Sequence, residues 1–174
     1  MVVVAASTAW AGPATASPSL RQVLAQVAAA LPWRPPLGHY WVGSGFGMRR
    51  DPFRHRPAFH PGIDLEAPMR APVLAAAPGR VVFAGRRGGY GRMVEIDHGG
   101  GVCTRYGHLS ALRVHRGQVV RSGQAIGAVG STGRSTGPHL HYEVRVAGIP
   151  RNPAVFMHPR TAVPQAVSAG QPNP

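Results

Sequence analysis

Lysine is absent from this chain and acidic residues are scarce. The 19 basic residues are all arginine, against six Asp and Glu, which gives a formal net charge of +13. Arginine keeps its charge at any biological pH, so the charge favours polyanionic partners. The arginines are nevertheless scattered between Arg21 and Arg160, with no basic helix, Cys/His finger spacing or RNA-binding aromatic signature. We therefore expect no nucleic-acid partner, and a basic nucleic-acid-binding protein is the alternative that the charge leaves open.

Cysteine is nearly absent as well. Cys103 stands alone, so no intrachain disulfide can form. It lies in the alternating run Val102–Tyr106, which favours a packed strand residue over a nucleophile. The chain also lacks an apolar run long enough to cross a membrane, so we expect no membrane span.

The two ends of the chain differ in composition from its middle. Residues 1–18 are mostly small and apolar and contain Ala-x-Ala sequences typical of cleavage sites, but no basic residue follows Met1, which predicts a partial signal peptide. Apolar residues at helical spacing predict a short helix, Ser19–Leu31, and a Pro-rich linker completes the segment 19–38. We expect one folded domain over residues 39–158 and a flexible tail over 159–174.

Glycine and proline are abundant, at 23 and 18 residues, and they divide the middle of the chain into short segments. Segments with apolar or alternating character between glycines predict strands. These are residues 73–75, 79–84, 93–98, 102–108, 118–120, 125–129 and 139–146. Regularly spaced short strands indicate an all-β fold, an antiparallel β-sandwich, with one short N-terminal helix.

Histidines are placed as metal ligands would be. Between His60 and Asp64 stand Pro61 and Gly62, and a bend at this glycine would let both side chains point at one ion. His139 and His141 alternate along a predicted strand, so both imidazoles lie on one face.

Two further residues extend this constellation. Glu143 continues the face of the His139–His141 pair as a carboxylate suited to orient a ligand imidazole. His108 ends another predicted strand and is placed to act on a metal-bound water without being a ligand. Three ligands with a fourth position open to water are typical of hydrolytic zinc sites.

The order and spacing of these motifs resemble those of the lysostaphin-type (LytM domain) zinc metallopeptidases, a family of bacterial peptidoglycan endopeptidases. The resemblance covers roughly residues 43–156. The segments that carry it are Ser44–Arg49, His60–Leu65, Ala71–Val73, Tyr106–Ser110, Ile126–Gly133 and Ser135–Glu143.

The resemblance implies specific roles for five side chains. It implies one Zn²⁺ held by His60, Asp64 and His141, with His108 and His139 as catalytic histidines. The other histidines match none of these positions, and we expect them on the surface or in turns: His39, His55, His98, His115 and His158.

The activity implied is hydrolysis of peptide cross-links in bacterial peptidoglycan by a metal-activated water. We expect the protein to be periplasmic or secreted and associated with the cell wall, and we favour a monomer. The alternative is a catalytically silent cell-wall-binding or amidase-activating module of the same fold, against which the five intact positions argue. Four arginines near the expected groove are candidates to bind carboxylates of the peptide stems, a solvated surface being the alternative: Arg49, Arg86, Arg87 and Arg134.

Overall fold

The computed structural model describes residues 34–157, which are built almost entirely of short strands. The predicted partial signal peptide, helix Ser19–Leu31 and tail all lie outside these residues. The strands are β1 (Trp41–Ser44), β2 (Gly47–Arg50), β3 (Pro57–His60), β4 (Ile63–Glu66), β5 (Pro72–Leu74), β6 (Gly79–Arg86), β7 (Arg92–Asp97), β8 (Val102–Leu109), β9 (Ala111–Leu112), β10 (Val119–Val120), β11 (Ala125–Ala128), β12 (His139–Val146) and β13 (Ile149–Arg151). Two short 3₁₀ helices are η1 (Gly88–Tyr90) and η2 (Pro153–Phe156).

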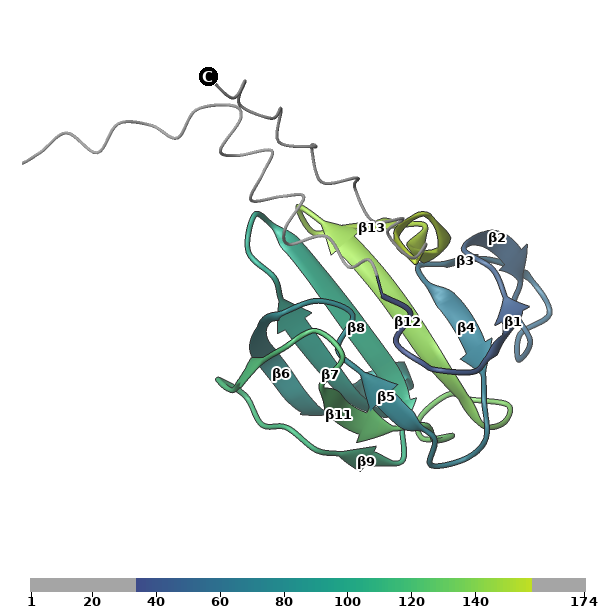
Figure 1. Ribbon diagram of the computed structural model, residues 1–174. Helices are drawn as coiled ribbons and strands as arrows, with labels where there is room; N and C mark the ends of the chain where they lie inside the picture. Colours follow the sequence, from purple (N-terminus) through teal and green to yellow (C-terminus); the bar gives the residue numbers. More distant parts are fainter. Residues whose placement is uncertain (1–33, 158–174) are drawn as a thin grey trace, which may run out of the picture.

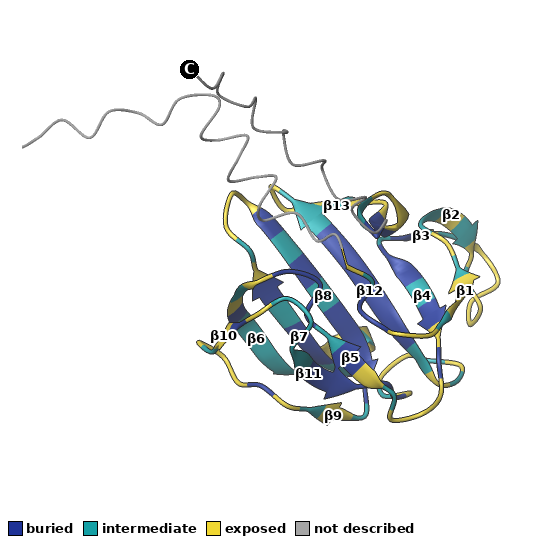
Figure 2. Ribbon diagram, viewed as in Figure 1, coloured by how far each residue is buried: buried dark blue, intermediate teal, exposed yellow. Residues whose placement is uncertain are grey.

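A large antiparallel sheet and a small one pack on each other (Figure 1). The large sheet has the strand order β1-β4-β12-β8-β7-β6-β10, with β13 attached to β12, and the small sheet has the order β5-β11-β9. One buried cluster joins Val73 and Ile126 of the small sheet to Tyr106 and Leu140 of the large sheet. Figure 2 shows the buried positions concentrated along the central strands. The expected all-β, antiparallel architecture is therefore confirmed.

The strands expected between residues 73 and 146 are all present, within a few residues of their expected bounds. The sequence pattern did not delimit the first four strands. Each is only four residues long. Adjacent residues of like character interrupt the alternation in β1 and β2, Pro57 begins β3, and β4 alternates but over four residues only. Two of them, β2 and β3, form a separate hairpin outside the large sheet. Within the described residues, no helix has the length and apolar character needed to cross a membrane.

Strand β12 brings the sequence motifs together because it lies between β4 and β8. His141 of β12 is paired with Asp64 of β4 on one side and with Gly107 of β8 on the other. Segments that are distant in the sequence are therefore adjacent at one end of the sheet.

The bend expected at Gly62 is present in the turn between β3 and β4, and the glycine has a further role there. It is not among the glycines with positive φ. A Cβ at this position would collide with the carbonyl oxygen of Tyr142 and would come within 3.0 Å of Cε1 of His141. Absence of a side chain therefore lets the turn between β3 and β4 pack directly on β12.

His98, which was expected on the surface or in a turn, lies half-buried where β7 enters the turn to β8 and belongs to a hydrogen-bonded chain. Its Nε2 lies 2.7 Å from the hydroxyl of Thr104, and that hydroxyl lies 2.9 Å from the hydroxyl of the buried Tyr106. The backbone N–H of Ala76 donates to the same tyrosine oxygen at 2.9 Å. Burial lowers the pKa of His98, and this outweighs its hydrogen bond to the carbonyl of Pro78.

Candidate metal centre

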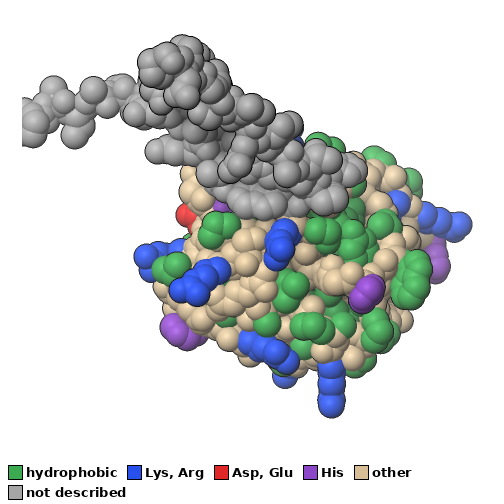
Figure 3. Space-filling model, viewed as in Figure 1, with side chains coloured by type: hydrophobic (Ala, Val, Ile, Leu, Met, Phe, Trp, Pro, Cys, Tyr) green, Lys and Arg blue, Asp and Glu red, His purple; other side chains and the backbone are tan. Residues whose placement is uncertain are grey.

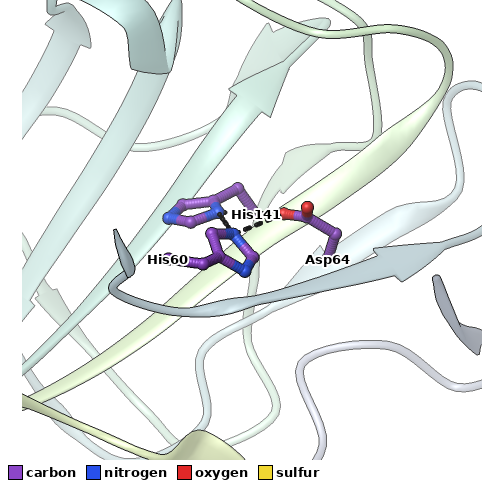
Figure 4. Close-up of side chains that lie close together, drawn as sticks. All are labelled: His60, Asp64 and His141. Atoms are coloured by element: carbon purple, nitrogen blue, oxygen red, sulfur yellow. Dashed lines mark hydrogen bonds and ion pairs between the residues drawn. The ribbon is translucent and has the colours of Figure 1, made fainter. Parts of the chain in front are cut away.

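The two ligand motifs meet at one end of the large sheet. Asp64 and His141 are direct cross-strand partners, so their side chains share one face. His60 is the last residue of β3, and the turn that follows leads into β4. Figure 4 shows the three side chains converging, although His141 and Asp64 are 77 positions apart in the chain.

The three candidate ligand atoms form a nearly equilateral triangle. Nε2 of His60 lies 3.1 Å from Nδ1 of His141 and 3.2 Å from Oδ1 of Asp64, and the last two atoms are 3.0 Å apart. Two ligands about 2.0–2.1 Å from a tetrahedral zinc ion lie roughly 3.3 Å from each other. The donor set and its dimensions therefore fit a zinc ion.

Hydrogen bonds behind the two imidazoles set which nitrogen faces the triangle. Nδ1 of His60 donates to the carbonyl oxygen of Gly45 at 2.7 Å, which leaves Nε2 with its lone pair toward the triangle. Nε2 of His141 donates to Oε1 of Glu143 at 3.0 Å, which leaves Nδ1 as the facing atom. Two facing lone pairs repel each other unless a proton or a metal ion lies between them, so the arrangement favours a bound cation.

The two carboxylate oxygens of Asp64 have different partners. Oδ1 faces the imidazoles, while Oδ2 accepts a hydrogen bond from the guanidinium of Arg49 at 3.2 Å. Burial by itself would raise the pKa of Asp64, but with a proton between the facing atoms the hydrogen bonds and charges of His141 and His60 outweigh burial and hold the pKa well below its usual range. The carboxylate is thus ionised and held with one oxygen toward the metal position.

Glu143 is fully buried behind His141 and is held by several donors. The hydroxyl of Tyr90 donates to Oε1 at 2.6 Å, and the guanidinium of Arg145 donates to Oε2 at 2.9 Å. Burial would raise the pKa of Glu143, but the hydrogen bonds from His141, Tyr90 and Arg145 outweigh it and lower the pKa to about 2. Glu143 therefore presents a charged acceptor to His141 and orients that ring, in the role expected of it.

His108 lies on the rim of the triangle in a backbone conformation that is rare for a residue with a side chain. Its φ is +60°, at the point where β8 ends. Nδ1 donates to the carbonyl oxygen of Thr132 at 2.8 Å, so Nε2 carries the free lone pair. Burial lowers the pKa of His108 to about 4, despite the opposing hydrogen bond to Thr132. This imidazole is therefore neutral at pH 7 and can accept a proton.

His139 lies opposite His108, with the two ring centroids 4.7 Å apart. Nδ1 of His139 donates to the carbonyl oxygen of Gly137 at 2.9 Å, and Nε2 lies 3.7 Å from Oδ1 of Asp64. Both rim histidines therefore have Nδ1 engaged by a backbone carbonyl and Nε2 free. The structure brings together all five histidine and aspartate positions that the resemblance assigns to the site.

These side chains open into a cleft of about 770 Å³. Loop residues 51–53 and residues 134–138 line it, and the two segments touch where Arg134 pairs with Asp51 and lies over the ring of Phe53. Arg49 and Arg134 line the cleft, but each is engaged by a carboxylate, Asp64 in the first case and Asp51 in the second. Arg86 and Arg87 do not line it, and Arg87 instead pairs with Glu95 at 3.2 Å.

Tyr90 was not expected at the site from the sequence, although its hydroxyl and ring both reach it. Its ring centroid lies 5.6 Å from that of His141. Gly107 leaves room for this packing, because a Cβ there would come within 3.3 Å of the tyrosine ring and 3.4 Å of Cβ of His141. The only signal in the sequence is an isolated aromatic residue within the glycine-rich segment Gly88–Gly91, which carries no information about its partner.

The face of the molecule viewed in Figure 3 carries no single basic patch. Figure 3 shows arginine side chains dispersed among apolar and neutral ones. An antiparallel β domain that aims two imidazoles and a carboxylate at one open position, flanked by two further histidines, defines the class of metal-centred hydrolase domains.

The chain belongs to Peptidase family M23, whose family model matches residues 58–153. Among curated proteins, it is 50% identical over 134 residues to the DD-carboxypeptidase/endopeptidase Mpg of Neisseria meningitidis, covering 77% of this chain and 31% of that protein. It is 45% identical over 121 residues to the peptidoglycan DD-endopeptidase ShyA of Vibrio cholerae, covering 68% of this chain and 28% of that protein. The chain thus spans about a third of the length of these relatives.

A solved structure of similar fold is the catalytic domain of the antimicrobial peptidase lysostaphin from Staphylococcus simulans. The TM-score is 0.61 and the sequence identity 32%, over 67% of this chain and 91% of that domain. The resemblance to the lysostaphin-type peptidases is therefore confirmed.

Proposed function

We propose that this protein is a zinc-dependent endopeptidase that hydrolyses peptide cross-links of bacterial peptidoglycan. The observation that carries the proposal is the triangle of His60, Asp64 and His141, with ligand atoms 3.0–3.2 Å apart and open to a cleft. The names of the relatives Mpg and ShyA support the substrate class and a cut at a D,D-peptide bond. A periplasmic or secreted location follows from such a substrate.

The ligand triangle and the two rim histidines are suited to different steps of the hydrolysis. A zinc ion in the triangle would supply a water of lowered pKa and would polarise the scissile carbonyl. With Nδ1 held by the carbonyl oxygen of Thr132, His108 has the Nε2 lone pair free and is placed to take a proton from the attacking water. His139 presents Nε2 beside Oδ1 of Asp64 and is suited to stabilise the developing oxyanion or to protonate the leaving amine.

The test is metal content together with hydrolysis of purified peptidoglycan sacculi, for the wild type, His141→Ala and His115→Ala. His115 lies on an exposed loop and is the matched control. We expect one zinc per chain and soluble products from the wild type and the control, and loss of both in His141→Ala.

The alternative is a catalytically silent wall-binding or amidase-activating module. Zinc bound at one per chain without cleavage of any cross-link type would favour that alternative. Absence of both zinc and cleavage from the wild type would contradict the enzyme proposal.

A further inference from the structure

A second row of side chains runs across the sheet beside the metal ligands. Glu66 is the cross-strand partner of Trp41 on β1 and also of His139 on β12. Directly opposed residues point to the same face of a sheet, and Glu66 shares its face with Asp64, two positions earlier on β4. The row Trp41–Glu66–His139 therefore lies about 7 Å along the strands from the row that holds the metal ligands.

Glu66 and Trp41 are accessible to a ligand. Glu66 is exposed, and 72% of the surface of Trp41 is exposed. Glu66 and Pro138 line the main cleft and also an adjoining hollow of about 330 Å³ whose wall includes Trp41. The hollow thus adjoins the metal cleft at Glu66 and Pro138.

Glu66 is the one carboxylate lining the cleft that has no ion-pair partner among the described residues. The cleft is lined by three carboxylates and two guanidinium groups. Asp64 is paired with Arg49, and Asp51 is paired with Arg134, whereas Glu66 has no ion-pair partner among residues 34–157. Glu66 is also outside the group of candidate metal ligands. A chain with a formal charge of +13 therefore keeps one uncompensated carboxylate beside its metal centre.

Gly43 makes room for this carboxylate. A Cβ at Gly43 would collide with Oε1 of Glu66. The pairing of β1 with β4 is irregular at the same point, between Val42 and Ser44. The edge strand is thus shaped to let the Glu66 side chain lie across it.

We propose that Glu66 and Trp41 form a subsite that binds an ammonium group of the substrate peptide. This inference rests on the proposed function and adds a substrate feature to it: a free amino group on a diamino residue next to the scissile bond. A carboxylate pairs with the ammonium through charge-assisted hydrogen bonds, and the face of the Trp41 indole attracts the same cation. Acetylation of the amine removes both interactions.

Glu66 has one competing role, which the register suggests. As the cross-strand partner of His139, it could act through that imidazole and not through the substrate. The two roles predict different kinetics. A subsite distinguishes an amine from an acetamide, whereas an effect through His139 lowers the turnover of both substrates alike.

The experiment compares two synthetic cross-linked stem-peptide dimers that differ only in whether the amine beside the scissile bond is free or N-acetylated. For the wild type, we expect acetylation to lower kcat/KM roughly five- to tenfold, mainly through KM, because the interactions lost are an exposed ion pair and a cation–π contact. Glu66→Gln should retain its zinc and treat the two dimers nearly equally. Asp97→Asn, an exposed acid on the distant strand β7, is the matched control and should discriminate like the wild type.

Calorimetric binding of the same two dimers separates this inference from the proposed function. Tighter binding of the free amine to the wild type, lost in Glu66→Gln, supports the subsite even where no hydrolysis is detected. Equal binding of the two dimers by the wild type overturns the subsite and leaves the endopeptidase proposal to its own test. An equal drop in kcat for both dimers in Glu66→Gln also overturns it, in favour of an action through His139.

Discussion

Arg49 holds Asp64 by the oxygen that faces away from the imidazoles. The guanidinium of Arg49 lies 3.2 Å from Oδ2, while Oδ1 lies 3.0 Å from Nδ1 of His141. A carboxylate fixed in this way offers one oxygen to an ion and keeps the other occupied.

Replacement of Arg49 by Gln should therefore weaken metal binding. We expect a fall in zinc affinity of about tenfold, toward the lower end of the range for a residue that orients a ligand, with the fold intact. Zinc affinity is measured by competition with a chelator. Arg56→Gln, an exposed neighbour on the same hairpin loop, should bind zinc like the wild type. Equal affinity in the two variants would show that the Arg49–Asp64 pair does not position the ligand.

Glu143→Gln should weaken metal binding and also destabilise the fold. The variant removes the charged acceptor behind His141 and leaves Arg145 without its carboxylate partner. We expect zinc affinity to fall by about 10- to 100-fold. Tyr90→Phe removes only one donor to the same carboxylate and should have a smaller effect on zinc affinity. The order of the two effects is the observation to check, by chelator competition under identical conditions.

The rim histidines should separate catalysis from metal binding. Because His108 and His139 are not corners of the ligand triangle, His108→Ala and His139→Ala should each retain zinc near one per chain. Hydrolysis of sacculi should fall by roughly 10²- to 10⁴-fold in each, as for loss of a general acid or base. A variant that loses its zinc together with its activity would be a ligand, which would contradict the assignment.

Gly62→Ala should destabilise the protein through steric overlap. The added Cβ would collide with the carbonyl oxygen of Tyr142 on β12, and backbone cannot move aside as a flexible side chain can. We expect a loss of about 1–3 kcal/mol in the free energy of unfolding, measured by urea denaturation. Gly38→Ala adds a Cβ with nothing within 4 Å and should be close to neutral.

His98 should make folding stability depend on pH in the mildly acidic range. Burial lowers its pKa in the folded state below the ordinary value of about 6.5, so the unfolded state binds the proton more readily. This contribution is complete above pH 6.5 and is lost as the pH falls below that value toward the folded-state pKa. Urea denaturation at pH 8 and pH 5 should therefore show a smaller pH-dependent loss for His98→Gln than for the wild type. An unchanged pH dependence would mean that His98 titrates alike in both states.

The strands of the domain could largely be predicted because glycine-bounded, apolar segments such as 102–108 and 139–146 carry a local signal. Strands β1–β4 could not be delimited, because four residues are too few to show a period even where, as in β4, apolar and charged residues alternate. The bend at Gly62 was predicted, but its close packing against β12 was not, because a neighbour on another strand cannot be inferred from local sequence.

The sequence by itself determined the inventory of the site: the alternation that places His139 and His141 on one face, the His60–Asp64 spacing, and the family motifs. The tertiary structure decided which groups hold these residues in place. It placed Arg49 behind Asp64 and Tyr90 behind Glu143, through hydrogen bonds between segments that are distant in the chain. It also placed Trp41 opposite Glu66, through the irregular pairing of β1 with β4. Periodicity reports which way a side chain points along its own strand, whereas register and close packing between strands determine what it meets.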